Sequence, residues 1–255
     1  MSLGYDANGN RTSDGSGSYI YLSASNRLSL YHGQTITLDA AGNTVNDGTY
    51  TYAYNNAGEL QSVSQGATLG SYVYNHLRQR TQKTTAAGTT VSHYDLAGNL
   101  IAETQANGTP LRAYVWADNN PIAQVTSGSP ETLAYLHADH EGTPRLATDA
   151  GRAVVWRFEG RVFGDTAPTG NVMVNLRYPG QYIDAETGLY YNWNRYYDPK
   201  IGRYITSDPI GLRGGLNTYS YVDSNPLSLV DPNGEFPLLV VIPVVAGVIN
   251  GGLSA

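Results

Sequence analysis

The amino-acid sequence predicts an all-β protein in which antiparallel β-hairpin repeats build one spiralling sheet. Only 14% of its residues are charged, against about 25% in an average globular protein. Their place is taken by 29 glycines and 21 tyrosines, which suit tight turns and half-buried strand faces respectively. A short segment containing Tyr, then Asp or Asn, then Gly recurs along the first half of the chain. No stretch of comparable strength has the period of a helix.

Residues 1–115 consist of imperfect copies of this segment, and we interpret each copy as one hairpin. Tyr ends a strand, Asp or Asn begins a turn by bonding its own backbone, and Gly supplies the left-handed position. The flanks alternate, as in YTYAY at 50–54, which is the period of a strand. Such repeats predict a continuous sheet in which each unit buries its face against its neighbours. The copies are YDANGNRT at Tyr5, LDAAGNTV at Leu38, YNNAGELQ at Tyr54, YNHLRQRT at Tyr74 and YDLAGNLI at Tyr94.

Residues 116–174 predict longer strands that lead into the core segment at 175–235. Their turns are marked by Asn-Pro at 120–121, Gly-Thr-Pro at 142–144 and Asp-Ala-Gly at 149–151, all of which interrupt regular structure. No linker there separates two independent domains.

Residues 175–235 contain two Asp-Pro-x-Gly tetrads, at Asp208–Gly211 and Asp231–Gly234. Pro restricts φ and Gly tolerates positive φ, so each tetrad predicts a tight turn. The 19 residues between the tetrads read as a strand that returns through a further turn. This arrangement predicts that Asp208 and Asp231 lie close together.

Residues 236–255 form an apolar tail with no charged side chain. Its dense apolar part is shorter than the roughly 20 residues that a membrane-spanning helix needs, and Pro243 interrupts it. Three interpretations stay open: a sheltered apolar peptide, part of a membrane-active element, or a disordered end. Membrane contact is expected only through this tail.

The segments GLYYNWNRYYDPKIGRYITSDPIG at 188–211 and GLNTYSYV at 215–222, followed by NP and DPNG, resemble the Rhs repeat-associated core. That core closes the YD-repeat shells of bacterial Rhs polymorphic toxins and of the Tc-toxin C component. The resemblance covers about 133–235, where YLHADHEGTPRLATD at 135–149 is similar to the strand, turn and strand that precede the core. The repeats before it resemble those of the shell.

The resemblance implies that this chain is the C-terminal part of a toxin-encapsulating β-shell, with residues 175–235 as a plug. It further implies a single-turnover aspartyl autoprotease that cuts just after the second tetrad and frees the C-terminal toxin inside the shell. The implied partners are the C-terminal toxin polypeptide, the remaining shell repeats and components of a secretion apparatus. The implied location is bacterial, secreted or delivered, for example by type VI secretion. No signal peptide is visible in this chain.

Asp208 and Asp231 are the candidate catalytic pair, because two adjacent carboxyl groups share one proton and can act as acid and base. Asp223, between the tetrads, is an alternative partner for either of them. Arg203 and Arg195 are candidates for orienting a carboxylate by bidentate pairing. By the resemblance, the cut falls between Glu235 and Phe236 or, alternatively, between Gly234 and Glu235. The competing interpretation is that both aspartates only cap turns.

Composition and motifs argue against other chemistry. The net charge is −6 and there is no basic run, so no nucleic-acid partner is expected. The chain has no cysteine, and His137 and His140 have no third ligand placed by the sequence, so no metal is expected. No nucleotide-binding or triad motif is present, and we expect no cofactor and no further enzymatic activity.

A second hypothesis is a non-catalytic, repeat-built adhesin or carbohydrate-binding surface. In that case the tyrosine-rich face would stack against sugar rings, and the chain would stay intact.

Overall fold

The computed structural model describes residues 2–240, and residues 1 and 241–255 are left out of the description. Fourteen strands of the described part form one sheet, here called the outer sheet, in which every strand pairs antiparallel with the next in sequence. Its strands are β6 (Thr37–Leu38), β7 (Thr44–Asn46), β8 (Thr51–Tyr54), β9 (Leu60–Gln65), β10 (Ala67–Tyr74), β11 (Arg80–Thr85), β12 (Gly88–Tyr94), β13 (Leu100–Gln105), β14 (Pro110–Ala117), β15 (Asn120–Thr126), β16 (Thr132–Ala138), β17 (Pro144–Thr148), β18 (Val154–Arg157) and β19 (Thr169–Gly170).

The remaining strands form smaller sheets at the N-terminal end and inside the curve. At the N-terminal end, β1 (Gly4–Tyr5) pairs with β2 (Arg11–Ser13), and β3 (Tyr19–Tyr21), β4 (Leu28–Tyr31) and β5 (Gln34–Thr35) form a second sheet. The inner sheet consists of β20 (Tyr182–Ile183), β21 (Tyr190–Asn192), β22 (Arg195–Asp198) and β23 (Arg203–Tyr204). It is followed by the 3₁₀ turns η1 (Gly211–Gly214) and η2 (Val222–Ser224) and by the pair β24 (Leu229–Val230) and β25 (Leu238–Leu239).

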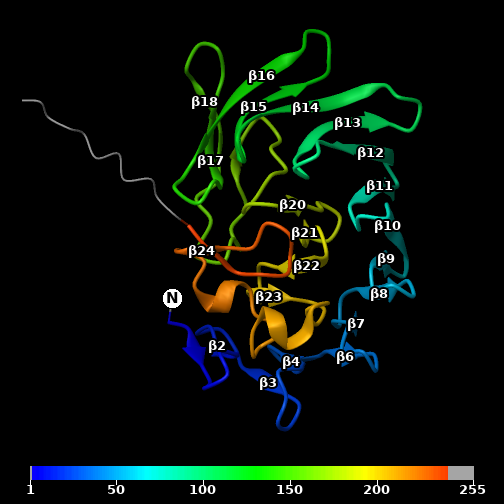
Figure 1. The fold of residues 1–255 in the computed structure, drawn as a ribbon, viewed down its shortest axis with the longest axis vertical. Coiled ribbons are helices and arrows are strands. Elements are labelled where there is room, and N and C mark those ends of the chain that lie inside the picture. Colours follow the sequence, from blue (N-terminus) through cyan, green and yellow to red (C-terminus); the bar gives the residue numbers. More distant parts are fainter. Residues whose placement is uncertain (1, 241–255) are drawn as a thin grey trace, which may run out of the picture.

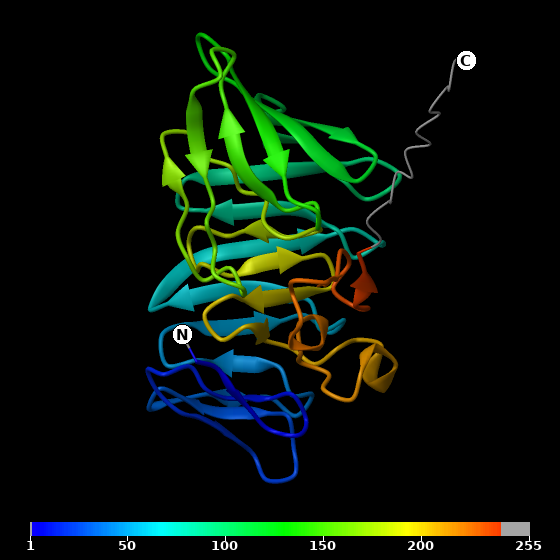
Figure 2. The ribbon, with the colours of Figure 1, turned by 90° about the vertical axis from the view of Figure 1, so that its left-hand side faces the viewer.

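The outer sheet curves around the inner sheet. In Figure 1 it rises from β6 on one side, passes over the top at β14 to β16 and descends through β17 and β18, with β20 to β23 in the middle. Figure 2 shows the same strands stacked along the molecule with the inner strands alongside them. The predicted all-β fold, a curved sheet of antiparallel hairpins ending in a plug, is confirmed.

Four of the five repeats make their turns through the chemistry that the sequence predicts; in the fourth, the Asn75 cap is kept but Arg78, with φ of 64°, takes the left-handed position instead of a glycine. In the third copy, the Asn55 side-chain oxygen accepts the backbone N–H groups of Ala57 and Glu59 at 2.9 and 3.0 Å. Gly58 has φ of 78°, a value that a side chain would disfavour. The register shifts by one residue at Tyr54, which then pairs with Leu60. The turn therefore closes with the tyrosine at the end of the strand.

The aromatic residue at the end of a strand also fastens its hairpin to an earlier one. The hydroxyl of Tyr74 donates to the carbonyl of Leu60 at 2.7 Å, and that of Tyr94 donates to the carbonyl of Arg80 at 2.9 Å. The indole N–H of Trp116 donates to the carbonyl of Leu100 at 2.9 Å. A tyrosine ring can thus be buried between repeats while its polar tip stays paired. This explains why a sheet so poor in phenylalanine can stack.

The main core lies between the concave face of the outer sheet and the inner sheet. Buried side chains of one cluster come from both sides: Tyr52, Leu60, Val63, Tyr72, Leu100, Tyr114, Ala134, Leu136, Ala147, Trp156 and Phe158 from the outer sheet and the residue that follows it, and Val174, Leu176, Tyr182, Leu189, Tyr191, Tyr196 and Ile205 from the inner region. The two sheets therefore form a single folded unit.

A buried ion pair joins the two sheets. Arg80 of β11 bonds the carboxylate of Asp184, with 2.8 Å between Nη2 and Oδ1, and its guanidinium lies over the ring of Tyr191 at 4.4 Å. Lys83 reaches the same carboxylate at 2.9 Å. Burial alone would raise the pKa of Asp184, but the charges of Arg80 and Lys83 outweigh it and hold this pKa below its ordinary value.

Of the predicted apolar tail at 236–255, only 236–240 belong to the described residues. Among residues 2–240, no helix has the length and apolar character needed to cross a membrane.

Replacing Arg80 by Met tests the joint between the sheets. Because Asp184 is fully buried, removing its main partner should lower the free energy of unfolding by about 3–5 kcal/mol. The matched control is Arg157→Met, which breaks an exposed pair with Glu159 and should cost no more than about 1 kcal/mol. Urea denaturation measures both, and equal losses would contradict the assignment.

Candidate functional site

Both Asp-Pro-x-Gly tetrads form the predicted tight turns. The Asp208 side chain accepts the backbone N–H of Ile210 at 2.9 Å, and Gly211 follows with φ of 62°. The Asp231 side chain accepts the backbone N–H of Glu235 at 2.9 Å, and Gly234 has φ of 73°. Each aspartate therefore uses one carboxylate oxygen to close its own turn and has a second oxygen free for another contact.

The second oxygens of the two aspartates meet at one nitrogen. Nη2 of Arg195 lies 2.9 Å from Oδ2 of Asp208 and 3.2 Å from Oδ2 of Asp231. Both carboxylate oxygens therefore contact the same nitrogen atom. All three side chains are buried. The structure thus places Asp208 and Asp231 side by side on a single guanidinium.

Tyr204 and Asn192 contact Asp231 and hold it in place beside Arg195. The Tyr204 hydroxyl donates to Oδ2 of Asp231 at 2.7 Å, and the Arg195 guanidinium lies 3.6 Å from the centre of the Tyr204 ring. The Asn192 side chain donates both to the Tyr204 hydroxyl at 2.7 Å and to the backbone carbonyl of Asp231 at 2.9 Å. Asp231 therefore receives more donors than Asp208.

The environment of Asp208 favours its protonated form. Burial raises the pKa of Asp208, and the negative charges of Asp231 and Glu235 raise it further. Arg195 and the N–H of Ile210 counteract this only in part, so the pKa stays above its ordinary value. Asp208 therefore keeps its proton to a higher pH than an exposed aspartate does.

The backbone at the end of the second turn lies against the pair. Arg195 Nε donates to the carbonyl of Gly234 at 2.5 Å. A Cβ atom at position 214 would collide with Oδ2 of Asp208 and would lie 2.7 Å from the carbonyl oxygen of Glu235. The carbonyl of the predicted scissile bond and the Asp208 carboxyl therefore approach the same point, and only glycine leaves room there.

Two other sequence candidates lie away from this arrangement. Asp223 is exposed, in η2, and is not among the acceptors of the Arg195 guanidinium, which are Asp208, Thr218, Asp231 and Gly234. Arg203 lies against the rings of Tyr21 and Tyr219, where it donates to the carbonyl of Asn26. Of the two arginines considered, Arg195 is thus the one at the aspartate pair.

Sequence reasoning did not single out Tyr204, Asn192 or Gly214. Tyr204 and Asn192 are 27 and 39 residues from Asp231 in the sequence, and no local pattern links them to it.

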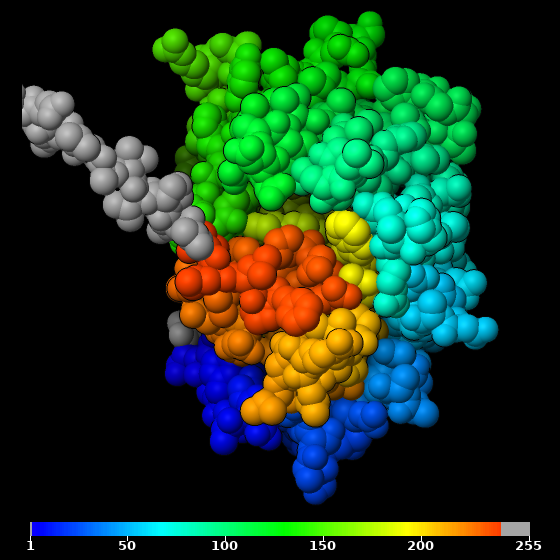
Figure 3. All heavy atoms as spheres, viewed as in Figure 1, coloured from blue at the N-terminus to red at the C-terminus, as the bar shows by residue number. Residues whose placement is uncertain are grey.

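A cavity of about 810 Å³ opens beside the aspartate site. Its walls come from β11 to β14 and from the turn 176–182, and its lining also includes Asn233, Glu235, Phe236 and Leu238. Figure 3 shows a hollow at this position, between the outer sheet in green and the last described segment in orange and red. The sequence did not predict this cavity.

Within residues 2–240 no three His, Asp or Glu side chains gather as metal ligands. His137 lies near the Thr148 hydroxyl and His140 near the carbonyl of Leu227, so each contacts a different neighbour.

A sequence model of the teneurin YD-shell family matches residues 1–226. The chain belongs to this family. The resemblance to Rhs and YD-repeat proteins is therefore confirmed, and with it the shell-type fold.

Bacterial toxins are among its relatives. The chain is 32% identical over 206 residues to the double-stranded DNA deaminase toxin A of Burkholderia cenocepacia, which covers 67% of this chain and 14% of that protein. It is 39% identical over 139 residues to the toxin protein Tse5 of Pseudomonas aeruginosa, covering 53% of this chain and 11% of Tse5. The YD-shell chain thus spans a small part of the length of these toxins.

Solved toxin structures have the same fold. The TcdB2–TccC3–TEV crystal structure matches with a TM-score of 0.70 at 27% identity, covering 91% of this chain and 13% of that one. The Photorhabdus luminescens Tc holotoxin pore matches with a TM-score of 0.72 at 25% identity, covering 94% and 13%. The YD-shell of this chain is therefore of the type that occurs in Rhs and Tc toxins.

Proposed function

We propose that this chain is the C-terminal part of a toxin-encapsulating shell and that it cuts itself once, after its second Asp-Pro-x-Gly turn. The cut leaves the downstream toxin polypeptide enclosed by the shell but no longer covalently attached. One observation carries the proposal: Asp208 and Asp231 share the Arg195 guanidinium, with the Glu235 carbonyl next to Asp208. A turn-capping role alone does not require the two carboxyl groups to meet.

The environments of the two carboxyl groups support different roles for them. Asp208, whose pKa is raised, is the acid that donates its proton to the Glu235 carbonyl oxygen. Asp231, which accepts hydrogen bonds from Tyr204 and Arg195, is the carboxylate base that takes a proton from a water molecule. The water oxygen bonds to the carbonyl carbon, which gives a tetrahedral intermediate with two hydroxyl groups. As the C–N bond breaks, the proton held by Asp231 passes to the nitrogen of Phe236, and one hydroxyl group returns a proton to Asp208, which leaves a carboxylic acid at Glu235.

The geometry favours the bond between Glu235 and Phe236 over the bond between Gly234 and Glu235. The carbonyl of Gly234 already accepts from Arg195, and the N–H of Glu235 already donates to Asp231. Both groups of the Gly234–Glu235 peptide are thus already engaged in holding the turn. The Glu235 carbonyl, in contrast, faces the acidic partner across Gly214.

The partners are assigned by the same proposal. They are the toxin polypeptide downstream, the remaining shell repeats, and components of a secretion apparatus that delivers the protein from the bacterium. The toxin names of the relatives and the small part of their length that this chain spans support this assignment.

Intact mass tests the cut directly. We expect a fragment that ends at Glu235 in the native chain and only the uncut mass in Asp208→Asn and in Asp231→Asn. Asp223→Asn is the matched control and should be cut normally. A fragment ending at Gly234 would move the site by one bond. Cleavage that persists in both aspartate variants would reject the pair as its cause.

The pH dependence of cleavage tests the assignment of the acid. Asp208 must hold a proton, and its pKa lies above the ordinary 3.8, so cleavage should persist above that pH. Once the pH exceeds the raised pKa, the rate should fall about tenfold per unit because the protonated fraction falls by that factor. Mass spectra taken at intervals after refolding from urea give the rate, and a rate that rises with pH would contradict the role of Asp208.

Replacing Gly214 by Ala tests the close approach of the Glu235 carbonyl to Asp208. The added methyl group has no room between the two oxygens, so the cut should slow by at least about tenfold, which corresponds to about 1.4 kcal/mol in the barrier. Gly151→Ala is the control, because Gly151 has no positive φ, lies in the turn between β17 and β18 away from the aspartate site, and an added Cβ would meet only the Asp149 side chain, at 3.3 Å. Equal cleavage by the native chain and by Gly214→Ala would show that the approach is not needed.

A further inference from the structure

The cavity beside the aspartate site has walls suited to a largely apolar occupant. Its lining includes Tyr94, Trp116, Tyr178, Pro179 and Trp193, and its volume lies in the range of ligand pockets. The charged groups of the wall are mostly paired within the protein: Arg80 and Lys83 bond Asp184, and Glu103 bonds Arg112 and Tyr182.

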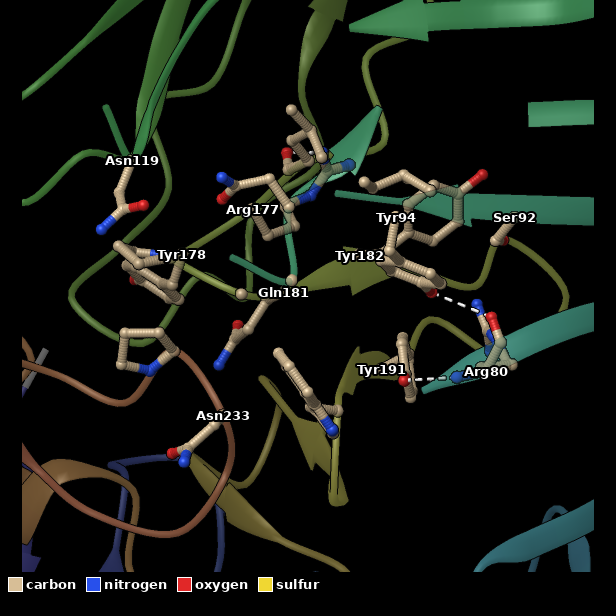
Figure 4. A pocket seen from close by; sticks show the side chains of 18 of the residues that line it. Arg80, Ser92, Tyr94, Asn119, Arg177, Tyr178, Gln181, Tyr182, Tyr191 and Asn233 are labelled. Carbon is tan, nitrogen blue, oxygen red and sulfur yellow. Dashed lines mark hydrogen bonds between the residues drawn. The ribbon is translucent and has the colours of Figure 1, made fainter. Parts of the chain in front are cut away.

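Polar groups in the cavity wall lack partners in the described structure. Gln181 is 2% exposed, and neither its amide oxygen nor its amide nitrogen has a hydrogen-bond partner within residues 2–240. The same holds for Nε of Arg177 and the side-chain oxygen of Asn194. Figure 4 shows the Gln181 side chain pointing into the pocket toward Asn233.

Unpaired groups of this kind are costly in a folded protein and normally have a partner. The missing partner must both donate and accept hydrogen bonds, as a peptide backbone does. An extended, apolar peptide therefore matches the unpaired amide of Gln181 and the aromatic walls together.

A peptide of this kind lies at the rim of the cavity. Phe236, Leu238 and Leu239 are 43%, 52% and 70% exposed, and Phe236 and Leu238 line the cavity mouth. In the uncut chain this segment is held on the surface, where Leu238 pairs with Val230 and Leu239 with Leu229, and Glu235 is tied to Asp231. A cut after Glu235 would release the Phe236 end from that anchor.

We propose that the cavity is a product site that binds the new N-terminal segment Phe236–Val240 after the cut. This inference rests on the proposed self-cleavage. Gln181 bonds the peptide backbone, while Phe236 and the leucines leave the surface for the aromatic walls. The freed end is thereby removed from the Glu235 carboxylate, and the downstream polypeptide stays attached without a covalent bond.

Binding of a separate peptide tests the site without any cleavage. The peptide Phe-Pro-Leu-Leu-Val is titrated into the full-length Asp208→Asn chain, with tryptophan fluorescence as the readout because Trp116 and Trp193 line the cavity. We expect saturable binding, and at least tenfold weaker binding by the Gln181→Leu chain. The control is the Gln105→Leu chain, which should bind as well as before because Gln105 is exposed and lies outside the cavity. Equal binding of Phe-Pro-Asp-Asp-Val, or unchanged binding by Gln181→Leu, would overturn the proposal.

Two further measurements separate this inference from the proposed cleavage. The midpoint of thermal unfolding should not fall in Gln181→Leu, because an amide without a partner contributes nothing to stability; a marked fall would show a structural role and count against the site. In the cleaved native chain, the piece beginning at Phe236 should co-elute with the rest on a sizing column and be released in Gln181→Leu. If the native chain is never cut but the peptide binds, the cleavage proposal fails and the binding site stands. If the chain is cut and no peptide binds, the site fails alone.

Discussion

The buried ion pair between Arg80 and Asp184 is the contact on which the arrangement of the two sheets depends. A charge placed inside a protein must be paired, because leaving it alone costs several kcal/mol. The outer sheet offers a guanidinium and the inner sheet a carboxylate, so neither surface is stable without the other. The rings of Tyr72 and Tyr191 lie over the guanidinium, while the Tyr72 hydroxyl donates to Glu186 and the Tyr191 hydroxyl accepts from the backbone N–H of Arg80. The core therefore consists mostly of apolar ring surface but contains hydrogen-bonded polar groups. A chain with 21 tyrosines and three phenylalanines can form a core only in this way.

The requirement that a buried charge be paired also shapes the aspartate site, where one cation, Arg195, faces two carboxyl groups. Arg195 serves two carboxyl groups, and so one of them is better held charged than the other. The Tyr204 hydroxyl donates to Asp231, while burial and neighbouring negative charge raise the pKa of Asp208. An asymmetric pair of this type is the usual basis of acid–base work by two aspartates. The arrangement that stabilises the turn thus also supplies the chemical difference that the proposed cleavage uses.

The position of the site within the fold connects cleavage to enclosure. The chain leaves the inner sheet through β24 and β25, beside the cavity that the outer sheet does not fill. A cut at this point separates the plug from the downstream polypeptide, while the unfilled cavity with its unpaired Gln181 lies next to the new end. In this proposal the curved sheet encloses the toxin, the aspartate pair cuts the chain, and the cavity holds the end that the cut creates.

Local interactions let the sequence by itself determine the all-β class, the hairpin repeats and the two Asp-Pro-x-Gly turns, because alternation and turn chemistry act between residues only a few positions apart. It also indicated that Asp208 and Asp231 could meet, since two turns flank a returning strand. Only the tertiary structure decided that Arg195, and neither Arg203 nor Asp223, lies at the aspartate pair, and that Tyr204 donates to Asp231. It also decided that Gly214 lies against Asp208 and the Glu235 carbonyl and that Gln181 lines the cavity. These contacts join segments that are remote in the chain. They depend on how one sheet curves around another, and no local pattern encodes that curvature.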